Sequence, residues 1–202
     1  MKLYYKPGAC SLATHITLYE AGAPFEVDEV DTEAGCTKSG KDYKSINPKG
    51  YVPALELSDE SVLTEGAAVL QYVADQNPES SLAPKAGSIE RTRVQEYLSY
   101  TGSELHKAFG PFFSDTASDV DKEKAGVNVA SKFDYLNEIL NDGRDYLVGN
   151  SFSVADAYLF VVSNWSNSVG IDLTRWPHIA AFVDRVSKRP ATQVAMKAEG
   201  LI

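Results

Sequence analysis

Cys10 is the residue whose type and position most strongly suggest chemistry. It follows a short strand-like run and a Pro7-Gly8 turn, and it opens an apolar-periodic segment that extends to Gly22. This order places a thiol in the first turn of a helix, where unpaired N–H groups and the helix dipole favour a thiolate. A thiolate attacks electrophiles and disulfides, so Cys10 is a candidate nucleophile. The alternative is an inert buried cysteine that only fills space.

The segment around Cys10 lacks the second cysteine of a dithiol redox motif, because it reads Cys10-Ser11-Leu12-Ala13. A single thiol at a helix start cannot resolve its own mixed disulfide locally. We therefore expect Cys10, with Ala9 before it, to work with an external thiol or as a binding group.

A second candidate site is Thr64-Glu65-Gly66, at the predicted start of another helix. Backbone N–H groups at a helix start bind carboxylates, and Glu65 would hold an ammonium group beside such a carboxylate. Together they would recognise the head group of an amino acid. The structural alternative is a capping carboxylate stabilised by the helix dipole.

A third candidate site lies on a long predicted helix over 89–109. Polar residues recur at helical spacing on the side opposite an apolar stripe, namely Ser99, Ser103, His106, Lys107 and Gly110. Lys107 would supply positive charge to an active-site wall, and His106 a titratable donor. A solvated polar face explains the same spacing without any function.

The elements that must position these residues differ between the two halves of the chain. Residues 1–80 alternate predicted strands (3–5, 25–30, 51–57 and from 62) with predicted helices (11–20 and 66–75), and a polar loop covers 31–47. Such alternation predicts an α/β unit whose sheet contains parallel strands.

Pro53 is unusual because proline cannot donate a hydrogen bond to a neighbouring strand. A proline that opens the third strand, beside a thiol at the first helix, is typical of a thioredoxin-like arrangement. We expect the Val52–Pro53 peptide to be cis, which leaves the Val52 backbone able to pair with an extended peptide-like ligand. An edge-strand proline without function is the alternative.

After linker-like residues 78–87, the chain reads as helical throughout. Helices are predicted over 89–109, 121–140, 154–163 and 178–188, followed by a tail to Ile202. The second of these should bury Val127 and Ala130 in an apolar stripe. The third is apolar nearly all round, which predicts a buried central helix, and Ser153-x-x-Asp156 predicts a capping box at its start. The domains are therefore predicted to span 1–80 and 87–202.

Composition narrows the class of protein. The chain of 202 residues carries a net charge of −9, which argues against nucleic acid and anionic membrane surfaces as partners. Its two cysteines and three histidines have no metal-site spacing, and so few cysteines favour a reducing compartment. No segment is long and apolar enough to span a membrane or start a signal peptide. We predict a cytoplasmic protein without a bound metal.

Taken together, several segments give the chain a specific resemblance to the beta-class bacterial glutathione transferases. The segments are 1–12 (MKLYYKPGACSL), 46–53 (INPKGYVP), 63–66 (LTEG), 103–107 (SELHK), 152–160 (FSVADAYLF) and 198–201 (AEGL). The resemblance covers residues 1–201. It implies an N-terminal thioredoxin-like domain that binds glutathione, an all-helical C-terminal domain, and a homodimer.

The resemblance also assigns roles by position. The family's thiol, which contacts the glutathione sulfur, corresponds to Cys10, and its cis-proline loop corresponds to Val52-Pro53. Its γ-glutamyl anchor corresponds to Glu65-Gly66. Its helical-domain wall corresponds to a set of four residues: Ser103, Glu104, His106 and Lys107.

The implied mechanism needs glutathione as co-substrate and no other cofactor. Glutathione would bind extended across Val52, and its thiolate would attack a small apolar electrophile. The electrophile would lie against four aromatic side chains: Phe109, Phe112, Phe113 and Trp165. Cys10 also permits glutathione-dependent disulfide reduction. The alternative function is a non-catalytic protein of the same fold that binds glutathione, other ligands or partners.

The loop after Asp31 departs from the family pattern. A lysine that reaches the glycyl end of glutathione is usual there, but this chain has Gly35, followed by Cys36. Loss of one charged contact should weaken glutathione binding by roughly 1–3 kcal/mol, unless Lys38 or Lys41 replaces it. Cys36 is a candidate to resolve a Cys10–glutathione disulfide, but we favour a neutral, exposed thiol.

Overall fold

The two ends of the chain belong to the same unit of the fold. The computed structural model describes residues 1–202 and divides into a first unit, Met1–Pro84 with Lys188–Ile202, and a second unit, Lys85–Ser187. Residues 188–202 were predicted to be part of the helical domain, and the structure instead packs them on the first unit. The reason is a final helix that contacts the first helix of the chain.

The first unit is built on a five-stranded mixed sheet. Its strands are β1 (Lys2–Tyr5), β2 (Glu26–Asp31), β3 (Cys36–Thr37), β4 (Ala54–Glu56) and β5 (Val62–Thr64), in the order β3-β2-β1-β4-β5. Strands β1 and β2 are parallel, with Leu3 opposite Val27, and the other pairs are antiparallel. The parallel pair confirms the α/β prediction, since it requires the crossover helix α1.

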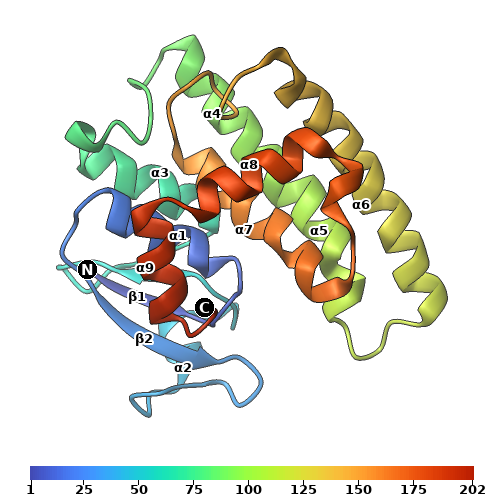
Figure 1. Cartoon of the computed structure of the whole chain (residues 1–202). Coiled ribbons are helices and arrows are strands. Elements are labelled where there is room, and N and C mark those ends of the chain that lie inside the picture. Colours follow the sequence, from blue (N-terminus) through green and yellow to red (C-terminus); the bar gives the residue numbers. More distant parts are fainter. The chain divides into compact units, whose positions relative to one another are not determined.

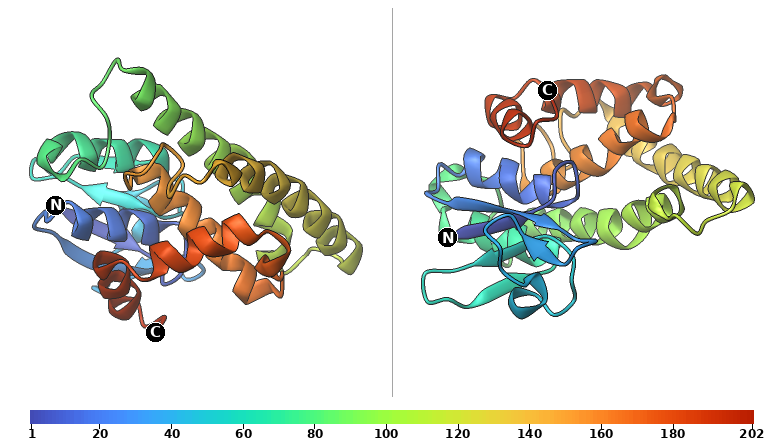
Figure 2. Two further views of the ribbon diagram at one scale, coloured as in Figure 1. Left: turned by 45° about the horizontal axis from the view of Figure 1, so that its top comes forward. Right: turned by 90° about the horizontal axis from the view of Figure 1, so that it is seen from below.

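Alternate residues of β1 face opposite sides of the sheet, and each side has its own core. Leu3 and Tyr5 face α1 (Ser11–Glu20) and α3 (Gly66–Gln76) and pack with Leu18, Leu55, Val69 and Val73. Tyr4 faces the other way and packs with Val30, Tyr43, Val52 and Ala54. Tyr43 begins the short helix α2 (Tyr43–Ile46). Because side chains along a strand alternate between the two faces, both faces of the sheet carry apolar residues, and helices cover both faces, as Figures 1 and 2 show.

The final helix, α9 (Pro190–Ala198), lies beside α1 and is fastened to it at both ends (Figure 1). At one end, Arg189 donates two hydrogen bonds to Glu20, at 2.6 and 2.8 Å. At the other end, the buried carboxylate of Glu199 accepts from the His15 ring and from the Gly8 N–H, both at 2.9 Å. The C-terminal segment thereby holds the turn that leads to Cys10.

Two local predictions in the first unit have different outcomes. The Val52–Pro53 peptide is cis, as predicted, and β4 begins directly after Pro53. The segment predicted as a polar loop, 31–47, instead contains β3 and α2. A two-residue strand and a four-residue helix are too short to produce a periodic pattern. A short 3-10 turn, Pro78–Ser80, follows α3.

The second unit consists of helices. The long helix predicted over 89–109 is divided into α4 (Ile89–Tyr100), a π-helical turn (Thr101–Leu105) and α5 (His106–Phe109), followed by a 3-10 turn (Gly110–Phe113). The others are α6 (Asp119–Ile139), α7 (Val154–Val169), α8 (Pro177–Ser187) and 3-10 turns at Leu140–Asp142 and Leu173–Arg175. No helix in the chain has the length and apolarity needed to cross a bilayer.

Helix α7 is the buried centre of the second unit, as its apolar sequence predicts. Every residue from Val154 to Val162 is buried, and α7 packs against both α4 and α8. The predicted capping box is also present: the Asp156 carboxylate accepts from the backbone and hydroxyl of Ser153, and from the Leu147 N–H, each at 2.8 Å. Helix α7 therefore begins at a fixed point in the core.

The stripe predicted for α6 is wrong at its first position. Val127 is 70% exposed, and the buried side chains are Ala125, Val129, Phe133 and Leu136. These follow steps of four, four and three, which is an ordinary helical stripe. Val127 lies two residues from both Ala125 and Val129, which places it on the opposite side of the helix from this stripe.

Candidate functional site

Cys10 lies at the N-terminal end of α1, as its sequence context predicts. It directly precedes Ser11, the first helical residue, and its carbonyl accepts from the Ala13 N–H at 3.1 Å. No acidic residue occupies the first turn, so no side-chain charge there offsets the positive end of the helix dipole. The side chain is half-buried and forms no disulfide. The position therefore suits a reactive thiol.

The Cys10 thiol is directed at the loop that contains the cis proline. Its Sγ donates a hydrogen bond to the Val52 carbonyl oxygen at 3.3 Å. Only the protonated thiol can donate this hydrogen bond. The bond is therefore broken when the thiol ionises, or when another donor binds the Val52 oxygen in its place. The structure thus brings together two of the predicted site segments, Cys10 and Val52-Pro53.

Buried side chains hold this loop from behind. The carbonyl of Tyr51 accepts from the Tyr43 hydroxyl at 3.1 Å and from the Asn47 side-chain amide at 2.7 Å. Burial raises the pKa of Tyr43 to about 12, so its hydroxyl remains a donor at neutral pH. The Val52 backbone is therefore presented by a fixed loop.

Glu65 precedes α3, as predicted, but its carboxylate already has a cation. Its side chain, 60% exposed, forms an ion pair with Lys49 and accepts from the Tyr51 hydroxyl at 3.3 Å. The Glu65 backbone has a φ of +68°, in the left-handed region that few non-glycine residues adopt. Such backbone positions often occur at ligand-binding sites. A ligand ammonium group would share this carboxylate with Lys49.

In the second unit, two of the predicted wall residues lie on the exposed side of the π-helical turn. The Ser103 hydroxyl donates to the Ser99 carbonyl at 2.8 Å, and Glu104 pairs with Lys132 of α6 at 2.6 Å. Lys107 is also exposed. These three side chains fit the predicted polar face.

His106 does not lie on that face, because the π-helical turn shifts its position. The turn places an extra residue in one helical repeat, and the His106 N–H bonds back to the Thr101 carbonyl. His106 consequently turns toward α7, where its Nδ1 lies 2.8 Å from the Tyr158 hydroxyl. Its ring also meets the Trp165 ring edge-to-face, with centroids 4.8 Å apart.

The environment of His106 keeps its imidazole neutral. Burial, with the Lys107 charge as a second cause, lowers the pKa of His106 to about 4. At neutral pH one ring nitrogen therefore carries a proton and the other accepts a hydrogen bond. His106 can act as a directed donor without carrying a charge.

The four predicted aromatic residues form one cluster, but they play different parts in it. Phe109 and Phe113 both contact Trp165, with centroids 5.8 and 5.4 Å away, and Phe109 also contacts Phe112. Phe113 is 55% exposed, whereas Phe109 has no exposed surface. Phe109 was predicted to touch an electrophile, and its burial instead gives it a supporting position behind Trp165.

Lys107 borders a cavity of about 690 Å³ between α5 and the start of α6. The cavity is otherwise lined by small and polar side chains, including Ser114, Lys124 and Asn128, and by none of the four aromatic residues. Lys107 therefore faces a cavity that none of the four aromatic side chains lines. Nowhere in the chain are three or more His, Cys, Asp or Glu side chains grouped to hold a metal ion.

Comparison with known protein families accounts for both units. Residues 1–75 match the N-terminal domain of glutathione S-transferases, and residues 100–190 match their C-terminal domain. The chain is 45% identical to glutathione S-transferase GstA of Escherichia coli O157:H7 over 201 residues, an alignment that covers 100% of both chains. This chain belongs to the glutathione S-transferase family.

Similar proteins of known structure indicate which class of transferase this chain resembles. A ternary complex of BphK, a bacterial transferase, is 50% identical over the full length of both chains, with a TM-score of 0.97. A sphingomonad transferase complexed with glutathione is 48% identical, again over both full chains, with a TM-score of 0.96. The beta-class transferase of Sphingomonas chungbukensis is 45% identical over both full chains, with a TM-score of 0.97. The predicted beta-class transferase and its two-part fold are confirmed.

Gly35 of this transferase lies at a backbone position that suits glycine. Its φ is +72°, and its N–H bonds to the Asp31 carbonyl at 2.8 Å. A side chain there would meet no other atom within 4 Å but would strain the backbone. Lys38 pairs with Glu29 at 3.5 Å, which leaves Lys41 as the uncommitted lysine of the predicted substitutes. Cys36 is half-buried in β3 rather than exposed.

Sequence reasoning missed two parts of the transferase site. Lys49 and Tyr51 meet at Glu65, and their place just before Val52-Pro53 was the available signal. Tyr158 contacts His106 from α7, and no local pattern pointed to it, because 52 residues separate the two positions. Apolar neighbours made Tyr158 look like an ordinary core residue.

Proposed function

We propose that the protein is a glutathione transferase that joins the thiolate of glutathione to small apolar electrophiles, a detoxification reaction. The observation that carries the proposal is the Cys10 thiol at the start of α1, hydrogen-bonded to the carbonyl of Val52 beside the cis Val52–Pro53 peptide. A sphingomonad structure of the same fold, 48% identical over the whole chain, is complexed with glutathione.

The first unit would bind glutathione. Its cysteinyl backbone would pair with Val52, and its γ-glutamyl carboxylate would meet the N–H groups at the start of α3, where Gly66 begins the helix. Its ammonium group would approach the Glu65 carboxylate. Glutathione that donates to the Val52 oxygen competes with the Cys10 thiol for this acceptor. Binding would thus turn the Cys10 thiol toward the glutathione sulfur, next to Ala9 and the helix start.

The second unit would supply the electrophile site and further polar groups. Phe112 and Phe113 would offer aromatic surface for a small apolar electrophile, together with the exposed edge of Trp165, which is only 9% exposed, and Phe109 supports them. His106 would donate a hydrogen bond to negative charge at the reacting centre. Ser103, Glu104 and Lys107 would contact the polar parts of glutathione, with Glu104 shared with Lys132.

A cysteine at position 10 favours a second reaction, glutathione-dependent disulfide exchange. The Cys10 thiolate would attack the glutathione sulfur of a mixed disulfide, form a Cys10–glutathione disulfide and release the other thiolate. A second glutathione thiolate would then attack the mixed disulfide on the enzyme, releasing oxidised glutathione and restoring Cys10.

One experiment tests both reactions and the non-catalytic alternative. Wild-type protein, Cys10→Ala and the matched control Cys36→Ala are assayed with an aromatic halide and with a glutathione mixed disulfide. We expect wild type and Cys36→Ala to catalyse conjugation, and Cys10→Ala to lose disulfide exchange. Glutathione binding without either activity in the wild type would contradict the proposal and support a binding protein.

We also propose that the protein is a homodimer, as is typical of its family. Helix α6 supports this proposal, because Val120, Val127 and Tyr135 leave large apolar surface exposed, at 56%, 70% and 43%. Sedimentation equilibrium tests it directly. A mass of twice the 22.0 kDa chain is expected, and a monomer at micromolar concentration would contradict the proposal.

A further inference from the structure

Tyr158 contacts the ring of His106 from the most buried helix of the second unit. It belongs to α7, is 6% exposed, and places its hydroxyl 2.8 Å from Nδ1 of His106. The start of α7 is fixed by the Ser153–Asp156 capping box, and its residues as far as Val162 are buried. A side chain on such an element is held in one place by packing.

The approach of Tyr158 to His106 depends on the π-helical turn. Gly102, within that turn, has no side chain, and a Cβ there would lie 3.5 Å from both the Oη and a ring carbon of Tyr158. The end of the Tyr158 ring therefore rests on the turn that displaces His106 toward α7. The Tyr158 and His106 rings meet nearly perpendicular, at 86°, and Trp165 contacts the imidazole as well. The imidazole is thereby held between two aromatic rings.

The chemistry of the two groups decides which of them donates. His106 is neutral at neutral pH because burial lowers its pKa to about 4, so one ring nitrogen accepts and the other carries a proton. A phenol, with an ordinary pKa of about 10, is a far better hydrogen-bond donor than a neutral imidazole N–H. The hydrogen bond at one nitrogen fixes the proton on the other.

We propose that Tyr158 is a positioning residue for His106: its hydroxyl donates to Nδ1 and thereby keeps the His106 proton on Nε2. His106 then presents a neutral N–H donor to negative charge on the reacting sulfur or the electrophile. Because Nδ1 accepts from Tyr158 and Nε2 already carries a proton, His106 takes no proton from glutathione, and the thiol proton goes to solvent. The assignment of the donor role rests on the proposed transferase function, whereas the assignment of the tautomer rests on the second unit alone.

The tautomer is measured first, without glutathione. The chain has three histidines, so long-range proton–nitrogen NMR spectra of histidine-labelled protein at pH 7 contain few signals, and His106→Gln identifies those of His106. We expect a protonated Nε2 and an accepting Nδ1 in the wild type. In Tyr158→Phe, which keeps the ring and its packing, this preference should weaken and the tautomer protonated at Nδ1 should become detectable, because only the smaller intrinsic preference of the imidazole remains. A protonated Nδ1 in the wild type, or an unchanged tautomer in Tyr158→Phe, would overturn the proposal.

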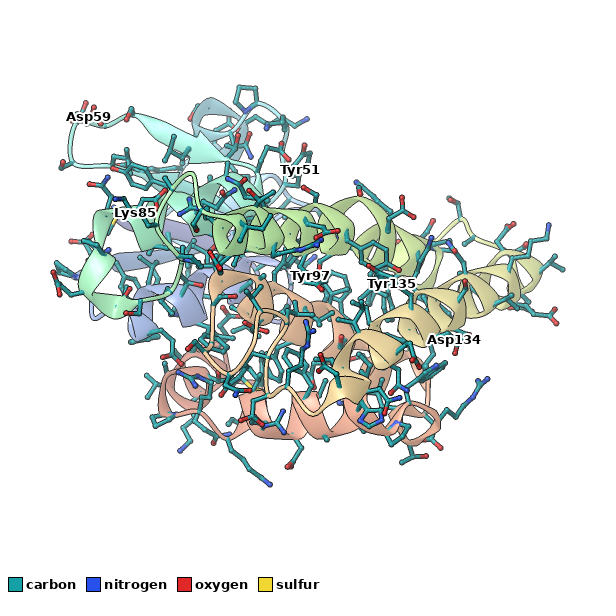
Figure 3. All side chains as sticks on the ribbon, turned by 90° about the horizontal axis from the view of Figure 1, so that it is seen from above. Tyr51, Asp59, Lys85, Tyr97, Asp134 and Tyr135 are labelled. Carbon is teal, nitrogen blue, oxygen red and sulfur yellow. The ribbon has the colours of Figure 1, made fainter.

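Tyr97→Phe is the matched control. Tyr97 lies on α4 (Figure 3), is also 6% exposed, and shares its hydroxyl with Arg144 rather than with a histidine. This variant loses one buried hydroxyl of the same kind in the same unit. It should leave the His106 tautomer and the conjugation rate unchanged.

Kinetics then test the consequence for the reaction. Tyr158→Phe should lower kcat for conjugation by about threefold to tenfold, as loss of one hydrogen bond predicts, and change the KM for glutathione less than twofold. In a His106→Gln background the same substitution should have no further effect, because Tyr158 acts through His106. An equal loss of rate in both backgrounds would refute the positioning role. If the wild type conjugates no electrophile, the transferase proposal fails, while the NMR result still decides the role of Tyr158.

Discussion

Replacing Glu199 by alanine removes the carboxylate that joins the end of α9 to the start of the chain. The Glu199 side chain has no exposed surface, and the His15 side chain beside it is 1% exposed. The carboxylate accepts two hydrogen bonds, from the Gly8 N–H and the His15 ring, both at 2.9 Å. The alanine variant leaves the buried His15 ring and the half-buried Gly8 N–H without this acceptor, and Nε2 of His15 already lacks a protein partner.

The expected loss of stability is large. A hydrogen bond to a charged group contributes about 1.5–3 kcal/mol, and breaking a buried pair costs about 3–5 kcal/mol. We expect Glu199→Ala to lower the free energy of unfolding of the first unit by about 3–5 kcal/mol. Glu199→Gln keeps the volume and one acceptor oxygen, so its loss should be about 1–2 kcal/mol.

Urea unfolding followed by two signals locates the effect. Both tryptophans, Trp165 and Trp176, belong to the second unit, so fluorescence reports on that unit, whereas far-ultraviolet circular dichroism reports on both. In Glu199→Ala the dichroism should begin to change at a lower urea concentration than the fluorescence. The rate of alkylation of Cys10 should also rise, because the Gly8 turn is no longer held.

Glu26→Ala is the control for removing an acidic side chain from the first unit. Glu26 is 78% exposed and pairs with Lys2 at 3.5 Å, so its loss should change stability by less than about 1 kcal/mol. If Glu199→Ala destabilised the protein no more than Glu26→Ala, the argument that α9 anchors the thiol loop would be wrong.

Three other predictions follow from single residues. Burial raises the pKa of Asp156 to about 6, so between pH 4 and pH 6 the folded state keeps a proton that the unfolded state has released. The free energy of unfolding of the wild type, compared with that of Asp156→Asn, should therefore fall by up to about 3 kcal/mol as pH rises from 4 to 7. Urea unfolding at each pH measures this difference. His106, with its pKa lowered to about 4, should stay neutral in an NMR pH titration down to about pH 5, and it should reduce stability as pH falls from 6.5 toward 4. Gly35→Lys should tighten glutathione binding fivefold or more in calorimetry if the lysine charge reaches the ligand. It should also lower the free energy of unfolding by about 1 kcal/mol, because the backbone φ of +72° is unfavourable for any residue with a Cβ. Gly35→Ala should show the same loss of stability without the tighter binding.

The parts of the fold that follow from local chemistry could be predicted from the sequence. Helix α1, the cis Val52–Pro53 peptide and the capped start of α7 each depend on a few adjacent residues, and the structure has all three. Cys10 and Val52 could be placed together because the thioredoxin-like arrangement fixes their elements.

Features that depend on long-range contacts could not be predicted. A π-helical turn differs from an α-helix by one residue per repeat, and nothing local at Thr101–Leu105 distinguishes the two. His106 was therefore assigned to the wrong side of its helix. Residues 189–202 are predicted only as a tail, because the attachment of α9 depends on contacts between distant parts of the chain. Arg189 binds Glu20 and Glu199 binds His15, and more than 160 residues separate the members of each pair.

The attachment of Lys188–Ile202 to the first unit also bears on how the chain folds during synthesis. Chains emerge from the ribosome N-terminus first, at about 5–20 residues per second, and domains generally fold as units. A nascent chain that has emerged only as far as Ser187 holds all of the second unit, yet it lacks α9 and Glu199. The second unit can therefore reach its final packing first. The turn that carries Cys10 waits for Lys188–Ile202, so the thiol acquires its native surroundings only after the whole second unit has been synthesised.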